Sequence, residues 1–396
     1  MNNKIVLNKH GLIEFFISFL AFNLAFGSLT LDSLQKAINV VGIAISFFIS
    51  LILFQKSSSN RPKIVIWLLL FLFLGGALYS TYLNSPNHTK INGWQAGIYY
   101  ILRIAAFFVS AVYIVEIGDG KKFAKNLFII SLIYCVLNDV LFLPRIATLR
   151  VTQGYLLNGK FSVSYTHLEA VAFYIFQGDL NNKTSKKITI ALILYTLIIS
   201  LLVDCITGVT GTLLLAIFVF LFPKKITRKP LLWIAISIVS FMAVYNYVYI
   251  VETKVYQNFF IGSLGRSTTL TGRINIYKKL PFLMSGHWLW GYGPSSSNEV
   301  IGNYLNMPNT QNGFWDIILQ VGVIPFAFLA ILTIYAIHQA DKRKQNFLVP
   351  IIAMLDVYSL LAMVEITIGL SFIGLVILVA IYSNLQVTTK RNVVLF

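Results

Sequence analysis

Residues 64–83 read IVIWLLLFLFLGGALYSTYL, an almost unbroken apolar run. A helix rises about 1.5 Å per residue and the hydrocarbon core of a bilayer is about 30 Å thick, so about 20 such residues cross it once. Similar runs recur along the 396-residue chain, which is 57% hydrophobic and 11% charged and has a mean hydropathy of +0.76. This composition leaves too little polar surface to cover a water-soluble body. The sequence therefore predicts an all-helical integral membrane protein.

The apolar runs predict about twelve transmembrane helices. We expect spans at 11–31, 36–55, 63–83, 94–116, 124–143, 164–177, 187–204, 206–222, 230–250, 312–337, 346–364 and 366–385. The sixth is short and contains His167 and Glu169, so we expect it to be tilted, broken or partly re-entrant. In this organisation residues 1–250 hold nine spans, 251–311 form one large external loop with short helices, and 312–396 complete a single membrane domain.

The positions of Lys and Arg fix the expected orientation. If both termini are cytoplasmic, every second connection is basic, as the positive-inside rule requires. These connections lie at 4–9, 56–63, 121–125, 183–187, 224–229, 342–344 and 390–391. The net charge of +17 is then explained by topology, and we expect no nucleic-acid partner.

Two external segments break this charge pattern. The first precedes the sixth span and contains Arg145, Arg150 and Lys160. The second runs from Val251 to Thr310 and contains Lys254, Arg266, Arg273, Lys278 and Lys279. Long loops are only weakly constrained by the positive-inside rule, so one interpretation is tolerated surface charge. The other is an external site for a multiply charged anion.

The large loop contains a second helical pattern, because Ile274, Tyr277 and Leu280 follow Arg273 at helical spacing. Thr271 can cap this helix, which places Arg273 in its first turn. Free backbone N–H groups and the helix dipole favour phosphate there, and a guanidinium adds bidentate hydrogen bonds. The pattern suits a diphosphate, and it equally suits an interfacial amphipathic helix with solvated cations.

Two further stretches of the loop can contact a ligand. Residues 288–294, WLWGYGP, predict a turn anchored at the membrane interface, in which Trp290 is also placed to stack on a sugar. Residues 309–316 run into the tenth span, and we expect Asn309 or Thr310 to cap it. Gln311 and Asn312 would then lie in its first turn, where amides can bind hydroxyl groups.

Among the charged residues inside predicted spans, where ionised groups are costly, four matter most: Arg103, Asp139, Glu169 and Asp356. Arg103 and Asp139 are both in the outer half of neighbouring spans and predict an ion pair, with a glycan or phosphate contact as the alternative. Asp356 has no evident partner. The sequence contains no Walker loop, zinc-binding histidine pair or serine elbow, so we expect no metal and no cofactor.

The loop residues resemble the bacterial polysaccharide polymerases and O-antigen ligases of the Wzy type. Their pattern is a small residue followed by Gly-Arg, then a Gly-containing turn, then His-Asn with a later Gly in the next span. Thr271-Gly272-Arg273, Gly291-Tyr292-Gly293 and Asn312 with Gly322 match it in order. The chain departs from the pattern at the histidine, which is Gln311 here. Glutamine cannot act as a base. Either the base is another residue, with Glu169, Glu252, His287 and Asp316 as candidates, or loss of the diphosphate leaving group drives the reaction and positioning suffices.

The resemblance implies a GT-C-like fold and an inverting glycosyltransferase of the bacterial plasma membrane. It would join undecaprenyl-diphosphate-linked repeat units into capsular or O-antigen polysaccharide on the outer face, among membrane lipids and with a flippase and a chain-length regulator as partners. By resemblance the catalytic residues are Arg273, Gln311 and Asn312. Substrate would contact Arg266, Arg150, Arg145, Lys160, Lys278, Trp290 and Arg103. A glycan ligase and a flippase or transporter for the same lipid are the alternatives.

Overall fold

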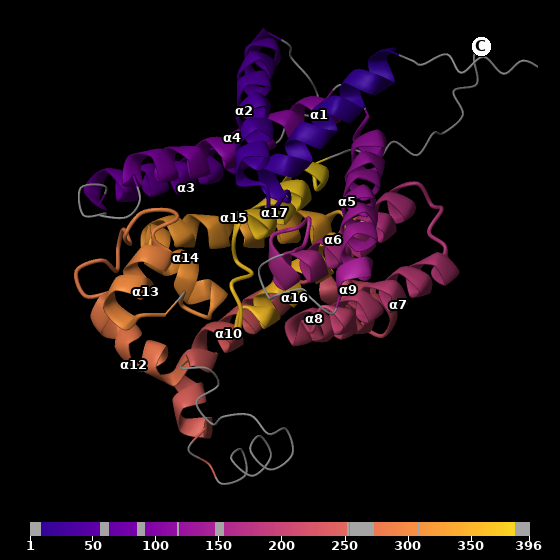
Figure 1. The fold of residues 1–396 in the computed structure, drawn as a ribbon. Coiled ribbons are helices and arrows are strands. Elements are labelled where there is room, and N and C mark those ends of the chain that lie inside the picture. Colours follow the sequence, from indigo (N-terminus) through magenta and orange to yellow (C-terminus); the bar gives the residue numbers. More distant parts are fainter. Residues whose placement is uncertain are drawn as a thin grey trace, which may run out of the picture.

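The computed structural model describes residues 9–55, 63–84, 92–116, 119–146, 154–251, 253, 273–307 and 309–384. Within these ranges the regular structure is helical, apart from one isolated bridge between Leu29 and Leu157 (Figure 1). Five helices are long and apolar enough to cross a membrane, and shorter apolar helices accompany them. The chain is therefore a multi-pass helical membrane protein.

The helices follow the predicted spans closely in sequence. Each of the first nine expected spans overlaps one helix, and so does each of the last two. The helices are α1 (Lys9–Ala25), α2 (Asp32–Gln55), α3 (Ile64–Asn84), α4 (Gly93–Glu116), α5 (Gly120–Phe142), α6 (Gly159–Leu180), α7 (Lys186–Leu202), α8 (Ile206–Phe220), α9 (Lys224–Thr227), α10 (Pro230–Val251), α12 (Arg273–Leu283), α13 (Ser297–Leu305), α14 (Gly313–Val321), α15 (Val323–Lys342), α16 (Val349–Leu361) and α17 (Leu370–Tyr382). Short 3-10 turns at Leu143–Arg145 and Asn346–Leu348 follow α5 and precede α16.

The prediction of a short or broken sixth span is wrong. The helix α6 is continuous over 22 residues. It packs against α5, α7, α8 and α16, and both of its polar residues are buried, with His167 1% and Glu169 2% exposed. Each of them has a hydrogen-bond partner on a neighbouring helix, so the helix needs no break to bring them to water.

The prediction of one continuous tenth span is also wrong. The segment forms two helices, α14 and α15, that meet at Gly322, whose φ is +83°. Residues 288–293 dock on this junction through backbone hydrogen bonds, including Val323 N to Trp288 O and Tyr292 N to Leu319 O, each 2.8 Å. We call this contact the interlock. A Cβ on Gly322 would lie 2.3 Å from the Leu289 carbonyl oxygen, so the close approach requires glycine.

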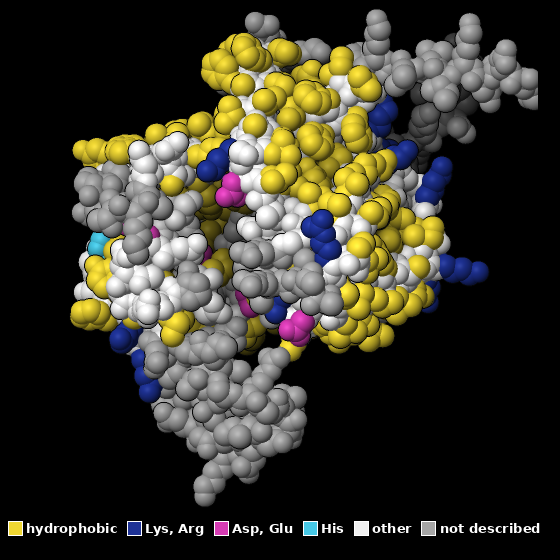
Figure 2. All heavy atoms as spheres, in the orientation of Figure 1, with side chains coloured by type: hydrophobic (Ala, Val, Ile, Leu, Met, Phe, Trp, Pro, Cys, Tyr) yellow, Lys and Arg dark blue, Asp and Glu magenta, His cyan; other side chains and the backbone are white. Residues whose placement is uncertain are grey.

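The surface of the helices is consistent with a lipid environment. On α2 and α3, Phe47, Phe48 and Phe71 are 63%, 64% and 72% exposed, which would be unfavourable in water. Hydrophobic side chains cover broad areas of the face in Figure 2, and Lys and Arg are sparse on it. In Figure 1 the helices α12, α13 and α14 gather at one side of the molecule, and the face in Figure 2 is hollowed beside them.

Candidate functional site

A polar pocket of about 270 Å³ lies among α1, α4, α6, α16 and α17. We call it the Arg103 pocket. Its lining includes four groups that can carry charge or move a proton, Arg103, Tyr165, Glu169 and Tyr358. Residues 25–28 at the end of α1, with 366, 367 and 369–371 at the start of α17, complete its rim. In the predicted topology every one of these segments lies in the outer half of the bundle.

Arg103 extends from α4 to the C-terminal end of α1. Its Nε donates to the Leu24 carbonyl at 3.0 Å and its Nη2 to the Asn23 carbonyl at 3.3 Å. Carbonyls in the last turn of a helix lack partners within it, so this arginine caps α1. Its third nitrogen, Nη1, makes no hydrogen bond to any residue in the described ranges. The guanidinium also lies over the Tyr99 ring, 5.7 Å from its centroid, and Nη1 keeps its donors for an anion in the pocket.

Glu169 lies across the same pocket on α6. One carboxylate oxygen, Oε1, accepts a 2.7 Å hydrogen bond from the Tyr358 hydroxyl, which comes from α16. Tyr358 is 2% exposed. A carboxylate oriented by a buried tyrosine and lining a pocket has the geometry of a general base. The sequence singled out Glu169, whereas Tyr358 was missed because a tyrosine in an apolar helix carries no distinguishing signal.

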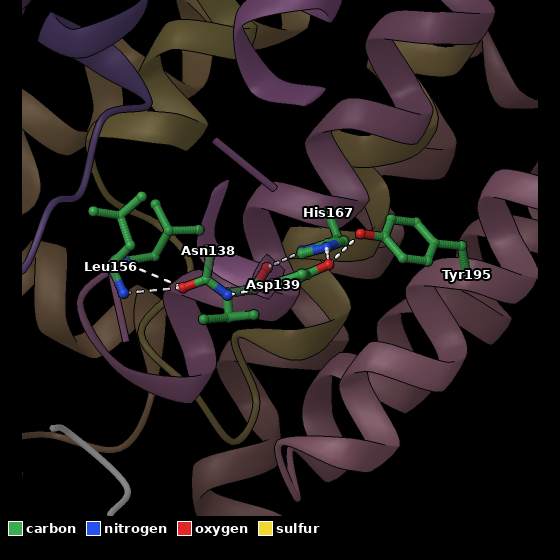
Figure 3. A network of polar contacts seen from close by, with 7 residues as sticks. Asn138, Asp139, Leu156, His167 and Tyr195 are labelled. Atoms are coloured by element: carbon green, nitrogen blue, oxygen red, sulfur yellow. Dashed lines mark hydrogen bonds and ion pairs between the residues drawn. The ribbon is translucent and has the colours of Figure 1, made fainter. Parts of the chain in front are cut away.

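The predicted ion pair between Arg103 and Asp139 is wrong. Asp139 on α5 faces α6 and α7, where its Oδ2 lies 3.1 Å from His167 Nε2 and accepts a hydrogen bond from the Tyr195 hydroxyl (Figure 3). His167 Nδ1 lies 2.8 Å from the Val163 carbonyl. Arg103 faces the end of α1 and Asp139 faces α6 and α7, so the two side chains have different neighbours.

The same polar network reaches a segment at the rim of the Arg103 pocket. Asn138 Nδ2 donates to Asp139 Oδ1 at 3.1 Å, and its Oδ1 accepts from the backbone N–H groups of Leu156 and Leu157 at 3.1 and 3.2 Å (Figure 3). The next residue, Asn158, donates its N–H to the carbonyl of Ser28, which lines the pocket. Asp139 is therefore connected to the rim of the Arg103 pocket through Asn138 and residues 156–158, and His167 joins this network through Asp139.

The predicted Arg273 helix is present as α12, and Arg273 is its first residue. The Arg273 side chain, together with Thr271, Arg266, Arg150 and Glu252, lies outside the described residues. One turn after Arg273, the buried Tyr277 donates its hydroxyl to the Gln311 carbonyl at 3.0 Å. The structure therefore brings the start of this helix close to the second predicted catalytic segment.

The predicted helix cap at Asn309 or Thr310 is wrong. Asn312 is the N-cap of α14, because its Oδ1 accepts from the backbone N–H of Trp315 at 3.0 Å. Gln311 precedes the helix in a left-handed conformation, φ +55°, and its Nε2 donates to Asn309 Oδ1 at 2.6 Å. Asn312 is completely buried. Its amide therefore positions α14 and does not face an open site.

The other predicted substrate contacts do not converge on the pocket. Lys160 donates to the Asp204 carbonyl at 2.8 Å, and Trp290 packs edge-to-face on Tyr79 with ring centroids 4.7 Å apart. Arg145 lies in the turn after α5 and Lys278 on α12, and both are exposed. Of the predicted ligands that the structure describes, only Arg103 lines the Arg103 pocket.

Two of the remaining candidate bases serve elsewhere. Asp316 is buried and accepts from Thr310 and Gln320 at 3.1 and 2.6 Å and from the Ser297 hydroxyl, which fixes the start of α13 on α14. His287 lines a different pocket.

No protein-family model and no curated protein matches this chain. The function is therefore inferred from the chemistry of the residues in the site.

Proposed function

We propose that this protein is a membrane-embedded polysaccharide polymerase of the bacterial plasma membrane. It would join undecaprenyl-diphosphate-linked oligosaccharides into a surface polysaccharide on the outer face. The observation that carries the proposal is the Arg103 pocket, which combines a guanidinium that can bind an anion with a carboxylate that can accept a proton. The order of the loop motifs, with their resemblance to Wzy-type polymerases, gives independent support.

The proposed reaction needs an anion site and a base. A hydroxyl of the incoming repeat unit attacks the anomeric carbon of the growing chain from the face opposite the diphosphate, which inverts that carbon. The bond to the diphosphate oxygen breaks, undecaprenyl diphosphate leaves with the electron pair, and the hydroxyl proton passes to Glu169. Arg103 and Arg273 stabilise the charge on the departing diphosphate. Arginines suffice as countercharge, so the step requires no metal.

The start of α12 is the second part of the proposed diphosphate site. Its first backbone N–H groups have no partner within the helix, and together with the helix dipole they favour an anion. Arg266, Arg145 and Arg150 are proposed to add positive charge on the same side. Gln311 and Asn312 take part indirectly, since they fix the segment on which α12 packs.

The test is polymer formation by the purified protein in detergent, with lipid-linked repeat units as the only substrate. A ladder of products is expected, whereas a flippase produces none and a ligase requires a different acceptor. Arg273→Ala should abolish long-chain polymer while the protein still inserts in the membrane. Lys121→Ala, which removes an exposed lysine on the predicted cytoplasmic side, is the control. Normal polymer length in Arg273→Ala would contradict the proposal.

A further inference from the structure

A second pocket, of about 340 Å³, lies between the end of α3, the turn that follows α12, and α13. We call it the Tyr304 pocket. Its lining includes Asn84, His287, Tyr292, Glu299, Asn303 and Tyr304. Ligand pockets in proteins hold about 300–1,000 Å³, so this one is large enough for a small molecule or one part of a larger one. The polymerisation step described above uses none of these residues.

The aromatic side chains of this pocket are placed to receive the apolar face of a ring. His287 stacks on Tyr292, with ring centroids 3.8 Å apart and planes 17° from parallel. The Tyr292 hydroxyl donates to the Leu283 carbonyl at 2.5 Å, which fixes the orientation of the ring. Tyr304 lies at the mouth and is 62% exposed. A sugar ring has a face of C–H groups that packs well on such surfaces.

The polar side chains of the Tyr304 pocket also favour a sugar. Glu299 and Asn303 are four residues apart on α13 and so project from one side of it. A carboxylate has about four acceptor sites and an amide both donates and accepts, which matches the hydroxyl groups of a sugar. The acidic side chain also disfavours phosphate. The Arg103 pocket is lined by an arginine as well as by Glu169, whereas the described lining of the Tyr304 pocket contains Glu299 and no arginine or lysine.

We propose that the Tyr304 pocket binds an uncharged sugar unit of the acceptor glycan. Only the assignment of the sugar to the acceptor glycan rests on the proposed function. The binding of a sugar is inferred from the lining of the pocket alone. α14 connects the two regions, since its N-cap contacts Met363 beside the rim of the Arg103 pocket and its end forms the interlock beside His287. A helix of 9 residues is roughly 13 Å long, so the connection is longer than one sugar unit.

The experiment measures binding and kinetics separately. The probe is the repeat-unit oligosaccharide released by mild acid from the lipid-linked precursors of the producing strain, and binding to the detergent-solubilised full chain is followed by titration calorimetry. Tyr304→Ala and Glu299→Gln should each weaken binding about fivefold to tenfold. In the polymerisation assay both should raise KM for the repeat unit with little change in kcat. Inorganic diphosphate should not displace the oligosaccharide.

The matched control is Tyr82→Ala, because Tyr82 is also 62% exposed but lies outside the pocket. The inference is overturned if the unaltered protein does not bind the oligosaccharide. It is also overturned if diphosphate displaces the sugar, or if Tyr82→Ala weakens binding as much as Tyr304→Ala. A protein that binds the sugar through Tyr304 but forms no ladder would disprove the polymerase and leave the sugar site standing. Tyr304→Phe keeps the ring and should bind normally.

Discussion

The Arg103 pocket and the interlock are held together in different ways. Around the pocket, side chains from α4, α5, α6, α7 and α16 hydrogen-bond to one another or to helix ends. At the interlock, backbone groups of residues 288–293 bond to backbone groups of α14 and α15, and the side chains of Ser80 and Asn84 on α3 add hydrogen bonds to the carbonyls of Gln320 and Gly291. Substitutions should therefore affect the two regions differently, with loss of chemistry or of buried pairs in one and backbone strain in the other.

The strongest expected effect is the loss of the proposed catalysis at the Arg103 pocket. Glu169→Gln keeps an acceptor for the Tyr358 hydroxyl but cannot take a proton, and general-base catalysis contributes about 10²–10⁴-fold. We expect kcat for polymerisation to fall by about that factor, with an unchanged unfolding temperature. The measurement is initial rate with lipid-linked repeat units. Activity within a factor of two of the unaltered protein would exclude Glu169 as the base.

Removal of Asp139 should destabilise the region behind the pocket. Asp139→Ala leaves His167, Tyr195 and Asn138 without a shared partner at a site that is 4% exposed. Breaking a buried pair in this way costs about 3–5 kcal/mol. The measurement is thermal unfolding in detergent. Asp341→Ala removes an ion pair at the exposed Lys229 and should cost less than about 1 kcal/mol. Equal unfolding temperatures would show that the network adds no stability.

At the interlock, Gly322→Ala should act through the backbone. A side chain at φ +83° is strained, and its Cβ would collide with the Leu289 carbonyl, so the expected cost is about 2–4 kcal/mol. Gly75→Ala is the control, because a Cβ at Gly75 in α3 meets no atom within 4 Å. This variant should be as stable as the unaltered protein or slightly more so. If both variants unfold at the same temperature, the close approach at Gly322 does not exist.

The smallest expected effect concerns the helix that joins the two regions. Asn312→Ala removes the N-cap of α14 and should cost about 1 kcal/mol. Asn312→Ser keeps a capping oxygen and should recover most of the stability. Thermal unfolding of the two variants separates capping from a direct role in catalysis. A large loss of activity in Asn312→Ser at normal stability would show that Asn312 acts directly in catalysis.

Hydropathy located the helices because the length of an apolar run is a local property of the chain. It failed at residues 312–337, since the break at Gly322 is imposed by a segment about thirty residues earlier. Charged residues inside predicted spans were expected to have polar partners, and this was correct for Arg103, Asp139 and Glu169. Their actual partners depend on how each helix is rotated about its axis, which apolar periodicity does not specify when a helix is hydrophobic on all sides. Tyr358 and the Tyr304 pocket depend on such rotations and on tertiary packing.

The interlock has a consequence for how such a protein can evolve. Main-chain hydrogen bonds do not depend on the side chains of the residues that form them, so Leu289 can change while the docking persists. Trp288 and Trp290 are held in addition by their ring contacts with Trp315 and Tyr79. Gly291 and Gly322 are constrained by the backbone itself, because a Cβ on either would lie within 2.6 Å of the opposing backbone. Homologues should therefore keep both glycines. Residues that line the Tyr304 pocket can then change without moving α14 or the Arg103 pocket.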